Sequence, residues 1–335
     1  MKGSKTMLEK LTSKTKEKNK EWKTLKLFKR HATVDSLIET MNEEDYFNRT
    51  SDSFGKLVLK RFLHNTLGMI GLAVLLILIL ASALAPIICP YDYEESHLEE
   101  LTTGKPLPPN EKFIWGTDAL GRDYFTRCLY GGRISLLIGF AATAMMVLIG
   151  VPLGIISGYF GGWVDTLLQR LLEIFNSIPT FLIMVIISAG LERSMWNVIW
   201  VMGVFYWPSF VRIIRAYFLS LKGQDYVQAA KALGIHPFKI IMRHMFPAVT
   251  MPLLIVVSTS IVSAIMAETS LSYLGFGILE PTPTWGSMLN ASTRFLRWVP
   301  TMALFPGMLI SLVTLSLNFI ADGLRDAFDP RSMQS

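Results

Sequence analysis

The chain has 335 residues, of which 51% are hydrophobic and only 17% are charged, and its formal net charge is +6. Soluble domains carry about a quarter charged residues, so this composition argues against a soluble enzyme and predicts an all-α integral membrane protein. The positive charge does not indicate nucleic-acid binding, because no basic groove-reading motif is present and attraction to anionic inner-leaflet lipid explains it.

The N-terminal residues 1–65 precede the first long apolar run and are rich in lysine. The first half of this arm has few apolar side chains, which predicts a solvated segment. The pair Ser36 and Glu39 resembles a capping box on a short helix. From Phe54 to Leu63 apolar and basic residues are mixed, which predicts a helix in the membrane interface or a cytoplasmic extension of the first span. No cleavable signal-peptide pattern occurs near the start, so the first span is expected to direct insertion.

Six apolar runs have the length of about 20 residues that a helix needs to cross a bilayer. They are Thr66 to Cys89, Ile134 to Gly158, Val164 to Ala189, Met195 to Arg212, Val249 to Leu271 and Thr301 to Ile320. The predicted fold is therefore a six-span helical protein. Its parts are the arm 1–65, a first transmembrane helix 66–89, an extracytoplasmic loop 90–133, a five-helix core 134–322 and a tail 323–335.

Charge predicts the orientation of these spans. Lysines and arginines concentrate before the first span and between spans four and five, whereas the loop 90–133 is acidic. Because cationic flanks stay in the cytoplasm, we expect both termini to be cytoplasmic, with the loop outside. Cys89 and Cys128 then lie near the outer face, as two free thiols or, alternatively, as a disulfide.

The second span carries glycines at intervals of four, Gly150, Gly154 and Gly158. Such a stripe lets a second helix approach closely and predicts a helix–helix seam, although small residues are also simply tolerated in lipid. Pro152 lies within this stripe and is expected to kink the helix.

Between spans four and five lies one polar, helix-prone stretch. Asp225 to Leu233 is rich in alanine and predicts a short helix, which Gly234 ends in a left-handed conformation. Pro237 suits the first turn of a second helix that runs to about Met245, and Pro247 is expected to stop it and open the next span. The sequence thus predicts a compact cytoplasmic helix pair over residues 224–246.

This stretch resembles the coupling motif of the membrane subunits of bacterial ABC importers. The resemblance rests on Gln228-Ala-Ala, on Gly234 after three further residues, and on His244-Met-Phe-Pro247 after nine more. Gln228 replaces a usual glutamate and Phe246 a common leucine. The resemblance implies that the pair seats in a groove of a separate ATPase, so charge placed at Ala229 or Ala230 should uncouple transport. The implied coupling residues are Tyr226, Gln228, Ala229, Ala230, Leu233, Gly234, His236, Pro237, Arg243 and Pro247.

Two further segments are similar to the second permease subunit of oligopeptide, dipeptide and nickel importers. One is Trp115-Gly-Thr-Asp-Ala-Leu-Gly-Arg-Asp123 with the following 129–135, and the other is 268–277 with 281–286. The resemblance covers about 62–330 and leaves the arm without an assigned role. It implies that the outer loops contact a binding protein or a partner subunit through Trp115, Thr117, Asp118, Gly121, Arg122, Asp123 and Trp285.

The sequence predicts no catalytic residue and no metal site in this chain. A P-loop needs glycine and lysine followed by serine or threonine, but Gly55-Lys56 precedes Leu57 and Gly104-Lys105 precedes Pro106. The pair Asp118 and Asp123 has no histidine or nucleophile in its loop, and Asp123 is expected to cap the next helix. His236 and His244 lack a cysteine or carboxylate that would complete a metal site.

Glu173 and Glu268 are acids inside predicted spans. Because an ionisable group in hydrocarbon is costly, each is a candidate for lining the transport path. Glu173 alternatively snorkels to the interface or pairs with Arg170 three residues earlier. Glu268 alternatively orders the loop that follows span five.

The resemblance implies a permease subunit that forms half of a path for oligopeptides or dipeptides by alternating access. Its partners would be a second permease, two ABC ATPases that bind ATP and Mg, an extracytoplasmic solute-binding protein, the peptide and the lipid bilayer, with no cofactor in this chain. The alternatives are import of nickel or another metal chelate by the same architecture, an ion-coupled secondary transporter, and a scaffold that does not transport.

Overall fold

The computed structural model describes residues 54–101 and 105–328, and these residues form helices and loops without a β-strand. The chain divides into two compact units, Met1–Leu59 and Lys60–Ser335. In the first unit only the start of helix α3 is described, and the second unit contains all the other described helices. The proposed capping box at Ser36 and Glu39 lies outside the described residues, as does the end of the tail, 329–335.

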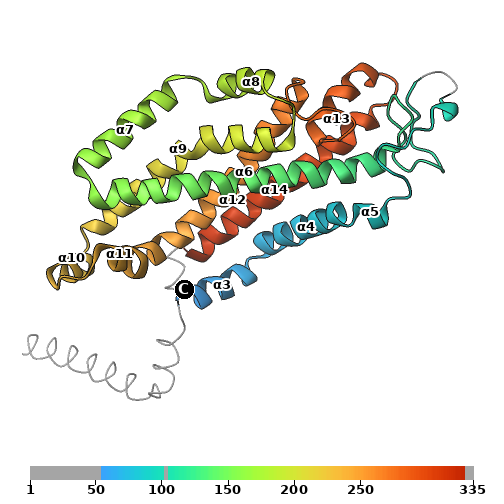
Figure 1. Ribbon diagram of the computed structural model, residues 1–335. Helices are drawn as coiled ribbons and strands as arrows, with labels where there is room; N and C mark the ends of the chain where they lie inside the picture. The colour runs from blue at the N-terminus through green and yellow to red at the C-terminus, as the bar shows by residue number, and fades with distance from the viewer. Residues whose placement is uncertain (1–53, 102–104, 329–335) are drawn as a thin grey trace, which may run out of the picture. The chain divides into compact units, whose positions relative to one another are not determined.

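Helices account for most of the described chain (Figure 1). In chain order they are α3 (Phe54–His64), α4 (Thr66–Ala83), α5 (Ala85–Ile88), η1 (Leu98–Glu100), α6 (Tyr124–Phe160), α7 (Gly162–Ser177), α8 (Thr180–Gly190), α9 (Met195–Lys222), α10 (Asp225–Ala232), α11 (Pro237–Ile240), η2 (Ile241–Met245), α12 (Phe246–Tyr273), α13 (Trp285–Ser292), η3 (Thr293–Phe295) and α14 (Thr301–Phe328).

Five segments of the described chain are long and apolar enough to span a membrane: α4, α6, α9, the run Pro237–Tyr273 and α14. The sixth predicted span is not one straight helix. It is the pair α7 and α8, bent by 73° at a short break. Pro179 causes the break, because proline disfavours a helical residue before it and Ile178 accordingly has an extended backbone.

Several helices are longer than the apolar runs that predicted them. α6 begins at Tyr124, ten residues before the expected Ile134, and α9 continues ten residues past Arg212 to Lys222. The apolar run marks only the part that suits hydrocarbon, and backbone hydrogen bonding continues the helix into polar surroundings. α6 also continues through Pro152.

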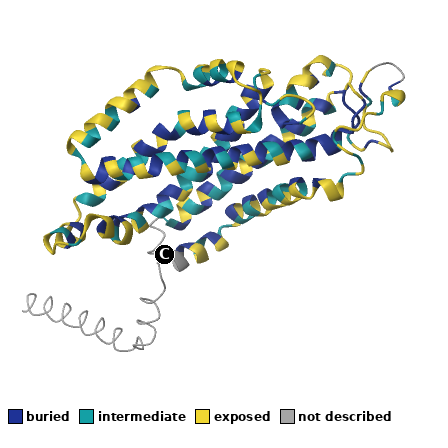
Figure 2. Cartoon of the chain, in the orientation of Figure 1, coloured by how far each residue is buried: buried dark blue, intermediate teal, exposed yellow. Residues whose placement is uncertain are grey.

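α6 is the central helix of the second unit and packs against α9 and α12, while α4 packs along α14. Figure 2 shows buried residues concentrated along α6 and α9, whereas α7 is largely exposed. α7 is nevertheless tied to α9, since Arg215 donates two hydrogen bonds to the Asp165 carboxylate at 2.6 and 2.7 Å.

The glycine stripe of α6 forms the predicted seam, and its partner is α9. A Cβ added at Gly154 would lie 2.8 Å from the Ile214 Cβ and 3.0 Å from the Val211 carbonyl oxygen. Gly150 and Gly158 approach Phe210 and Phe218 in the same way, at 2.6 Å. The two backbones therefore touch along three successive turns, as small residues at membrane helix interfaces permit.

We predict that Gly154→Ala destabilises the bundle by about 1–3 kcal/mol, the usual cost of overpacking. Gly307→Ala is the matched control, because no atom lies within 4 Å of the added Cβ and the residue is helical. For both variants, the free energy of unfolding is measured in mixed detergent micelles. Equal stability of the two would contradict the close approach at this seam.

Candidate coupling element and outer charge network

The segment Lys222–Pro247, which we call the coupling element, folds as two short helices joined at Gly234. α10 ends with Leu233 as its C-cap, and Gly234 follows with φ +71°. The Gly234 amide donates to the Lys231 carbonyl at 2.9 Å, and the Ile235 amide donates to the Ala230 carbonyl at 3.1 Å. These two bonds define a Schellman motif, so the predicted left-handed stop at Gly234 is confirmed.

Replacing Gly234 with alanine tests this turn. The added Cβ would meet no atom within 4 Å, so the cost is that of the left-handed backbone alone, about 1–2 kcal/mol. We expect amide hydrogen exchange in α10 to become about 5–30-fold faster. Gly223→Ala is the control, because its φ of −82° is ordinary for any residue. An unchanged exchange rate in Gly234→Ala would argue against a left-handed turn.

The coupling element has one face inside the bundle and one outside. Val227 and Ala230 are buried and belong to the main hydrophobic core. Leu233 and Phe238 are 80% and 66% exposed, and Tyr226 is half exposed. Ala230 is one of the predicted coupling residues, but helical periodicity turns it inward with Val227, three residues earlier. Of the predicted coupling residues, those exposed and free to meet a partner are Tyr226, Gln228, Ala229, Leu233, Gly234, His236, Pro237, Arg243 and Pro247, and the apolar Phe238 and Met242 are exposed as well.

Polar side chains of the element cap its helices. Gln228 Nε2 donates to the Lys222 carbonyl oxygen at 2.6 Å, which satisfies the end of α9. A glutamate carboxylate cannot donate this bond, so glutamine at this position has a structural role of its own. His236 Nδ1 accepts from the Phe238 amide at 3.3 Å and caps α11. Arg243 is exposed.

Pro247 does not stop the second helix, contrary to the prediction. A π-helical turn, Ile241–Met245, follows α11 directly, and the Phe246 amide donates to the Ile241 carbonyl five residues earlier. α12 then begins at Phe246 with Pro247 in its first turn. Proline is tolerated at this position because the first turn of a helix needs no amide donor. The widened π-helical turn before it lets the helix continue into α12.

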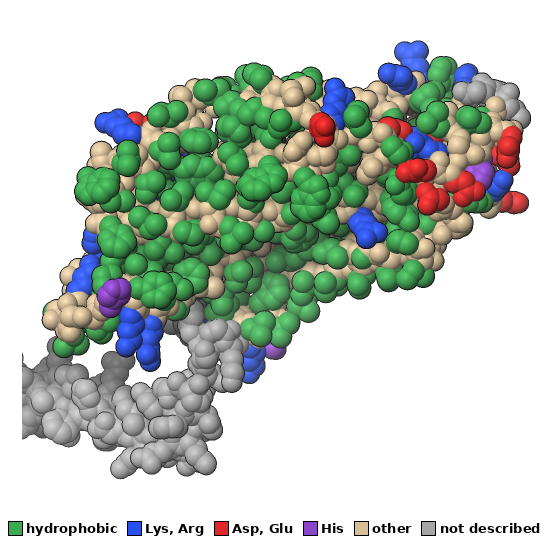
Figure 3. All heavy atoms as spheres, viewed as in Figure 1, with side chains coloured by type: hydrophobic (Ala, Val, Ile, Leu, Met, Phe, Trp, Pro, Cys, Tyr) green, Lys and Arg blue, Asp and Glu red, His purple; other side chains and the backbone are tan. Residues whose placement is uncertain are grey.

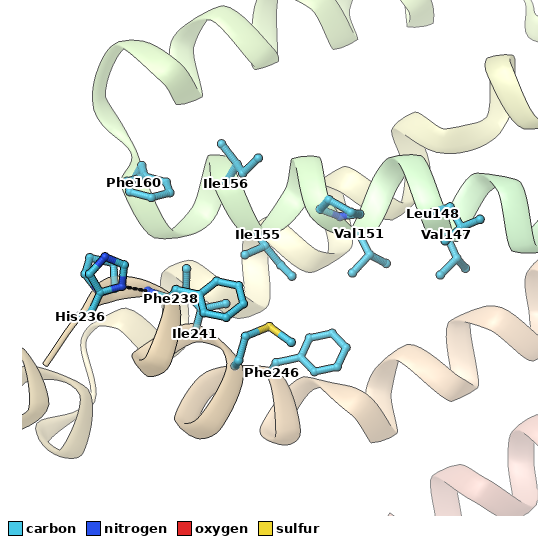
Figure 4. Close-up of a pocket in the computed structure, with 13 residues that line it drawn as sticks. Val147, Leu148, Val151, Ile155, Ile156, Phe160, His236, Phe238, Ile241 and Phe246 are labelled. Carbon is cyan, nitrogen blue, oxygen red and sulfur yellow. Dashed lines mark hydrogen bonds between the residues drawn. The ribbon is translucent and has the colours of Figure 1, made fainter.

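A groove of about 650 Å³ separates the coupling element from α6. Figure 4 shows Phe238, Ile241 and Phe246 on one wall, and Val147, Val151 and Ile155 of α6 on the other. The walls are apolar apart from His236 at one end. Figure 3 shows hydrophobic side chains over most of this face, with basic groups near the coupling element and acidic groups at the opposite end of the bundle.

At that opposite end, the segment 115–123 is a tight loop that leads into α6. Asp118 Oδ1 accepts from the backbone amides of Leu120 and Arg122 at 2.8 and 3.0 Å. Gly121 has φ +73°, and an added Cβ would lie 2.7 Å from the His97 carbonyl group. Asp123 accepts from the Thr126 amide at 2.8 Å, so the predicted cap of the next helix is confirmed.

Two arginines and two carboxylates form a charge network beside this loop, in which Arg122, Arg127 and Asp118 are buried and Glu280 is half exposed. Arg122 contacts Asp118 and Glu280, both at 2.6 Å. Arg127 contacts the same two acids at 3.4 and 3.3 Å. Its Nη1 also donates to the carbonyls of Tyr93 and Pro281 at 3.1 and 3.3 Å. Burial lowers the pKa of Arg122, but the carboxylates more than offset this and its pKa is raised.

This outer charge network, defined as Asp118, Arg122, Arg127 and Glu280, joins three segments. They are the outer loop, the start of α6 and the loop between α12 and α13. Asp118 and Arg122 were predicted as outer-loop contact residues, whereas Arg127 and Glu280 were missed. The sequence signal that could have found them is Arg127 itself, an arginine in the first turn of an apolar helix. A buried arginine requires a charged partner.

Trp285 and Trp115 also hold this end of the bundle together. Trp285 is buried, and its indole Nε1 donates to the Cys128 carbonyl at 2.9 Å. Trp115 stacks on Phe305 with ring centroids 4.2 Å apart. Thr117 is also buried, and it accepts from the Leu107 amide at 2.9 Å. Their contact with a binding protein stays a prediction. Cys89 and Cys128 are free thiols.

The two acids proposed for the path lie in different surroundings. Glu173 is exposed and forms an ion pair with Arg170 at 2.7 Å, which was one alternative from the sequence. Glu268 is 1% exposed and accepts from the hydroxyls of Ser135 and Ser272 at 3.1 and 2.7 Å. Ser135 also accepts from the Trp285 amide at 3.3 Å, so Glu268 connects α12 to α6 and α13.

A bundle of candidate spanning helices with an exposed helix pair between two of them is the architecture expected of a membrane permease subunit. The chain belongs to the family described as binding-protein-dependent transport system inner membrane component, whose model matches residues 150–334. Residues 53–109 match the N-terminal transmembrane domain of oligopeptide transport permease C. The chain is thus a multi-pass membrane permease subunit that works with a separate ATPase and a binding protein.

Curated relatives resemble nearly the whole chain. It is 36% identical over 272 residues to the dipeptide transport system permease protein DppC of Alkalihalophilus pseudofirmus, covering 81% of this chain and 88% of the relative. It is 35% identical over 289 residues to the oligopeptide transport system permease protein OppC of Bacillus subtilis, covering 86% and 93%. A chain of the inward-facing MetNI methionine ABC transporter shares the fold, with a TM-score of 0.50, 17% identity and coverage of 61% and 97%.

Proposed function

We propose that this chain forms half of the translocation path of an ATP-driven importer of oligopeptides or dipeptides. The observation that carries this conclusion is its 36% identity to a dipeptide permease over 81% of the chain and 88% of the relative. A second, related permease would supply the other half. Two ATPase subunits bind ATP and Mg in the cytoplasm, where both termini of this chain also lie, and an extracytoplasmic binding protein delivers the peptide.

The coupling element is the part that receives force from the ATPase. Leu233 and Phe238 are large apolar side chains left exposed on a polar, capped helix pair, the arrangement expected of a surface that a partner covers. Val227 and Ala230 anchor the same helices in the core, so a push on the element reaches the bundle. The groove beside α6 gives the element space to shift when the ATPases close.

The long helix α6 carries this movement towards the outside. Its glycine seam joins it to α9, which leads directly into the coupling element, and the outer charge network holds its other end. Closure of the ATPases would therefore tilt α6 and α9 together and open the path outward. The exposed tip of the outer loop, Ala119 and Leu120, offers a surface on which the binding protein docks, whereas Trp285 is buried and supports that loop from inside. Glu268 is enclosed here with Ser135 and Ser272, so it would line the path only after a rearrangement of α6 and α12 that exposes it.

Reconstitution tests the proposal. The chain is placed in proteoliposomes with the second permease, the two ATPases and the binding protein. We expect ATP-dependent accumulation of a labelled tetrapeptide, and ATP hydrolysis that rises when the loaded binding protein is added. Omitting this chain should abolish both. Uptake of a nickel chelate without peptide uptake would show that the cargo is a metal chelate and not a peptide. Proton-driven uptake by this chain alone would overturn the whole proposal.

A further inference from the structure

Arg133, on the outer half of α6, differs from the arginines near the start of that helix. It lies nine residues after Tyr124 and is exposed. Within the described ranges, 54–101 and 105–328, its guanidinium forms no ion pair and no hydrogen bond. Arg122 and Arg127, by contrast, are buried and paired with carboxylates. An exposed guanidinium on a spanning helix requires an anion or water.

A groove of about 440 Å³ begins at Arg133. Its walls are one face of α6, with Leu136, Leu137 and Phe140, and one face of α4, with Ile79 and Ala83. The α6 residues follow Arg133 at intervals of three, four and seven, so they lie on a single helical stripe. Apart from Arg133 the only polar lining residue is Ser82. The groove is therefore apolar with one cationic end.

The outer end of this groove is closed. A Cβ added at Gly132 would lie 2.6 Å from Ser82 Oγ and 2.8 Å from Trp285 Cζ2, so α4, α6 and α13 touch there. Phe140 lies seven residues beyond Arg133, about 10 Å farther along α6 towards the middle of the bundle. The charge thus marks the end nearest the outer loop, and the apolar walls extend inward from it.

We propose that this groove binds one phospholipid from the membrane leaflet at the Tyr124 end of α6. The Arg133 guanidinium pairs with the lipid phosphate, for which its planar donors are suited, and one acyl chain lies between α4 and α6. Charge complementarity and the direction of the groove both match a phospholipid in that leaflet. A peptide fits less well, because its backbone amides would find only the Ser82 hydroxyl along the walls.

Lipid binding here does not depend on the cargo, so it is tested on the complete importer in detergent. Phosphatidylglycerol is added, and both the melting temperature and the lipid retained after gel filtration, seen by native mass spectrometry, are recorded. The unmodified complex should be stabilised and should retain the lipid. Arg133→Gln should weaken retention at least tenfold, and Arg133→Lys should weaken it less. Arg297→Gln, at an exposed arginine outside the groove, should behave like the unmodified protein.

Leu137→Trp provides a second variant, because it fills the groove and leaves the guanidinium in place. It should also lose the lipid, and diacylglycerol, which lacks the phosphate, should not stabilise any form. A photoreactive side chain at position 137 should crosslink to lipid. Equal retention by Arg133→Gln and the unmodified complex, stabilisation by inorganic phosphate alone, or crosslinking to the second permease or to peptide instead of lipid would each overturn the proposal.

Discussion

Replacing Arg127 with methionine is expected to destabilise the protein by about 3–5 kcal/mol, the usual cost of removing one partner of a buried ion pair, because Arg122 alone then balances two carboxylates. Arg127 is 2% exposed and contacts Asp118 and Glu280. It also satisfies two carbonyls from loops that are distant in sequence. Its loss removes all four interactions at once, and methionine fills the space without replacing any of them. The outer end of α6 should become accessible to protease.

The matched control is Arg170→Met, the same change at an ion pair that is open to solvent. Arg170 pairs with Glu173 at 2.7 Å, and both side chains are more than half exposed. Such pairs contribute about 0–1 kcal/mol, so this variant should unfold close to the unmodified protein. Chemical denaturation in mixed micelles compares the two. Similar stability of both variants would show that the outer charge network is not buried in the folded protein.

A double-mutant cycle identifies the network as the cause. Glu280→Gln alone removes the carboxylate charge that pairs with Arg122 and Arg127. Glu280 is half exposed, so this single change should cost less than Arg127→Met. Combined with Arg127→Met it should cost less than the sum of the two single changes, because the pair then loses both charges together. If the destabilisations of the two single variants simply add up in the double variant, Arg127 stabilises the protein through its packing or its hydrogen bonds to the carbonyls of Tyr93 and Pro281, and not through Glu280.

The sequence predicted the parts of this structure that depend on local chemistry. Apolar length located the spans, and Asp123 capped α6 as its residue type suggested. Gly234 adopted the left-handed turn because few other residues do so at low cost. The stripe through Gly154 marked a seam, since close approach of two helices needs small side chains. Each of these inferences uses residues within a few positions of one another.

The parts that were missed depend on which distant segments meet. Arg127 and Glu280 are separated by 153 positions, and no local pattern joins them. The bend between α7 and α8 was passed over because the apolar run continues through Pro179. Pro247 was read as a stop, although a π-helical turn lets the helix continue. Which side of α10 faces the core was open until Val227 and Ala230 were seen to pack inward.

Because Ala230 packs inward, glutamate substitutions at Ala229 and Ala230 should have different effects, although the sequence analysis expected both to uncouple transport. Ala229 is exposed, so a glutamate there leaves the fold intact and places a charge on the surface that we propose the ATPase covers. Ala230 is 6% exposed, so a glutamate there buries an unpaired carboxylate and should reduce the amount of folded protein. We therefore expect Ala229→Glu to give normal protein levels with defective coupling, and Ala230→Glu to give low levels.

The largest functional loss is expected from Leu233→Asp. Leu233 is 80% exposed and ends α10, so aspartate disturbs no internal contact of this chain. If the ATPase covers this side chain, the change should weaken the association by about 2 kcal/mol or more, about 30-fold, as at the centre of other interfaces. Copurification of the ATPase and peptide uptake should fall together. Leu98→Asp, the same change at a 60% exposed leucine in the outer loop, should leave ATPase copurification unchanged. Normal ATPase binding and uptake by Leu233→Asp would show that force enters this permease elsewhere than at the coupling element.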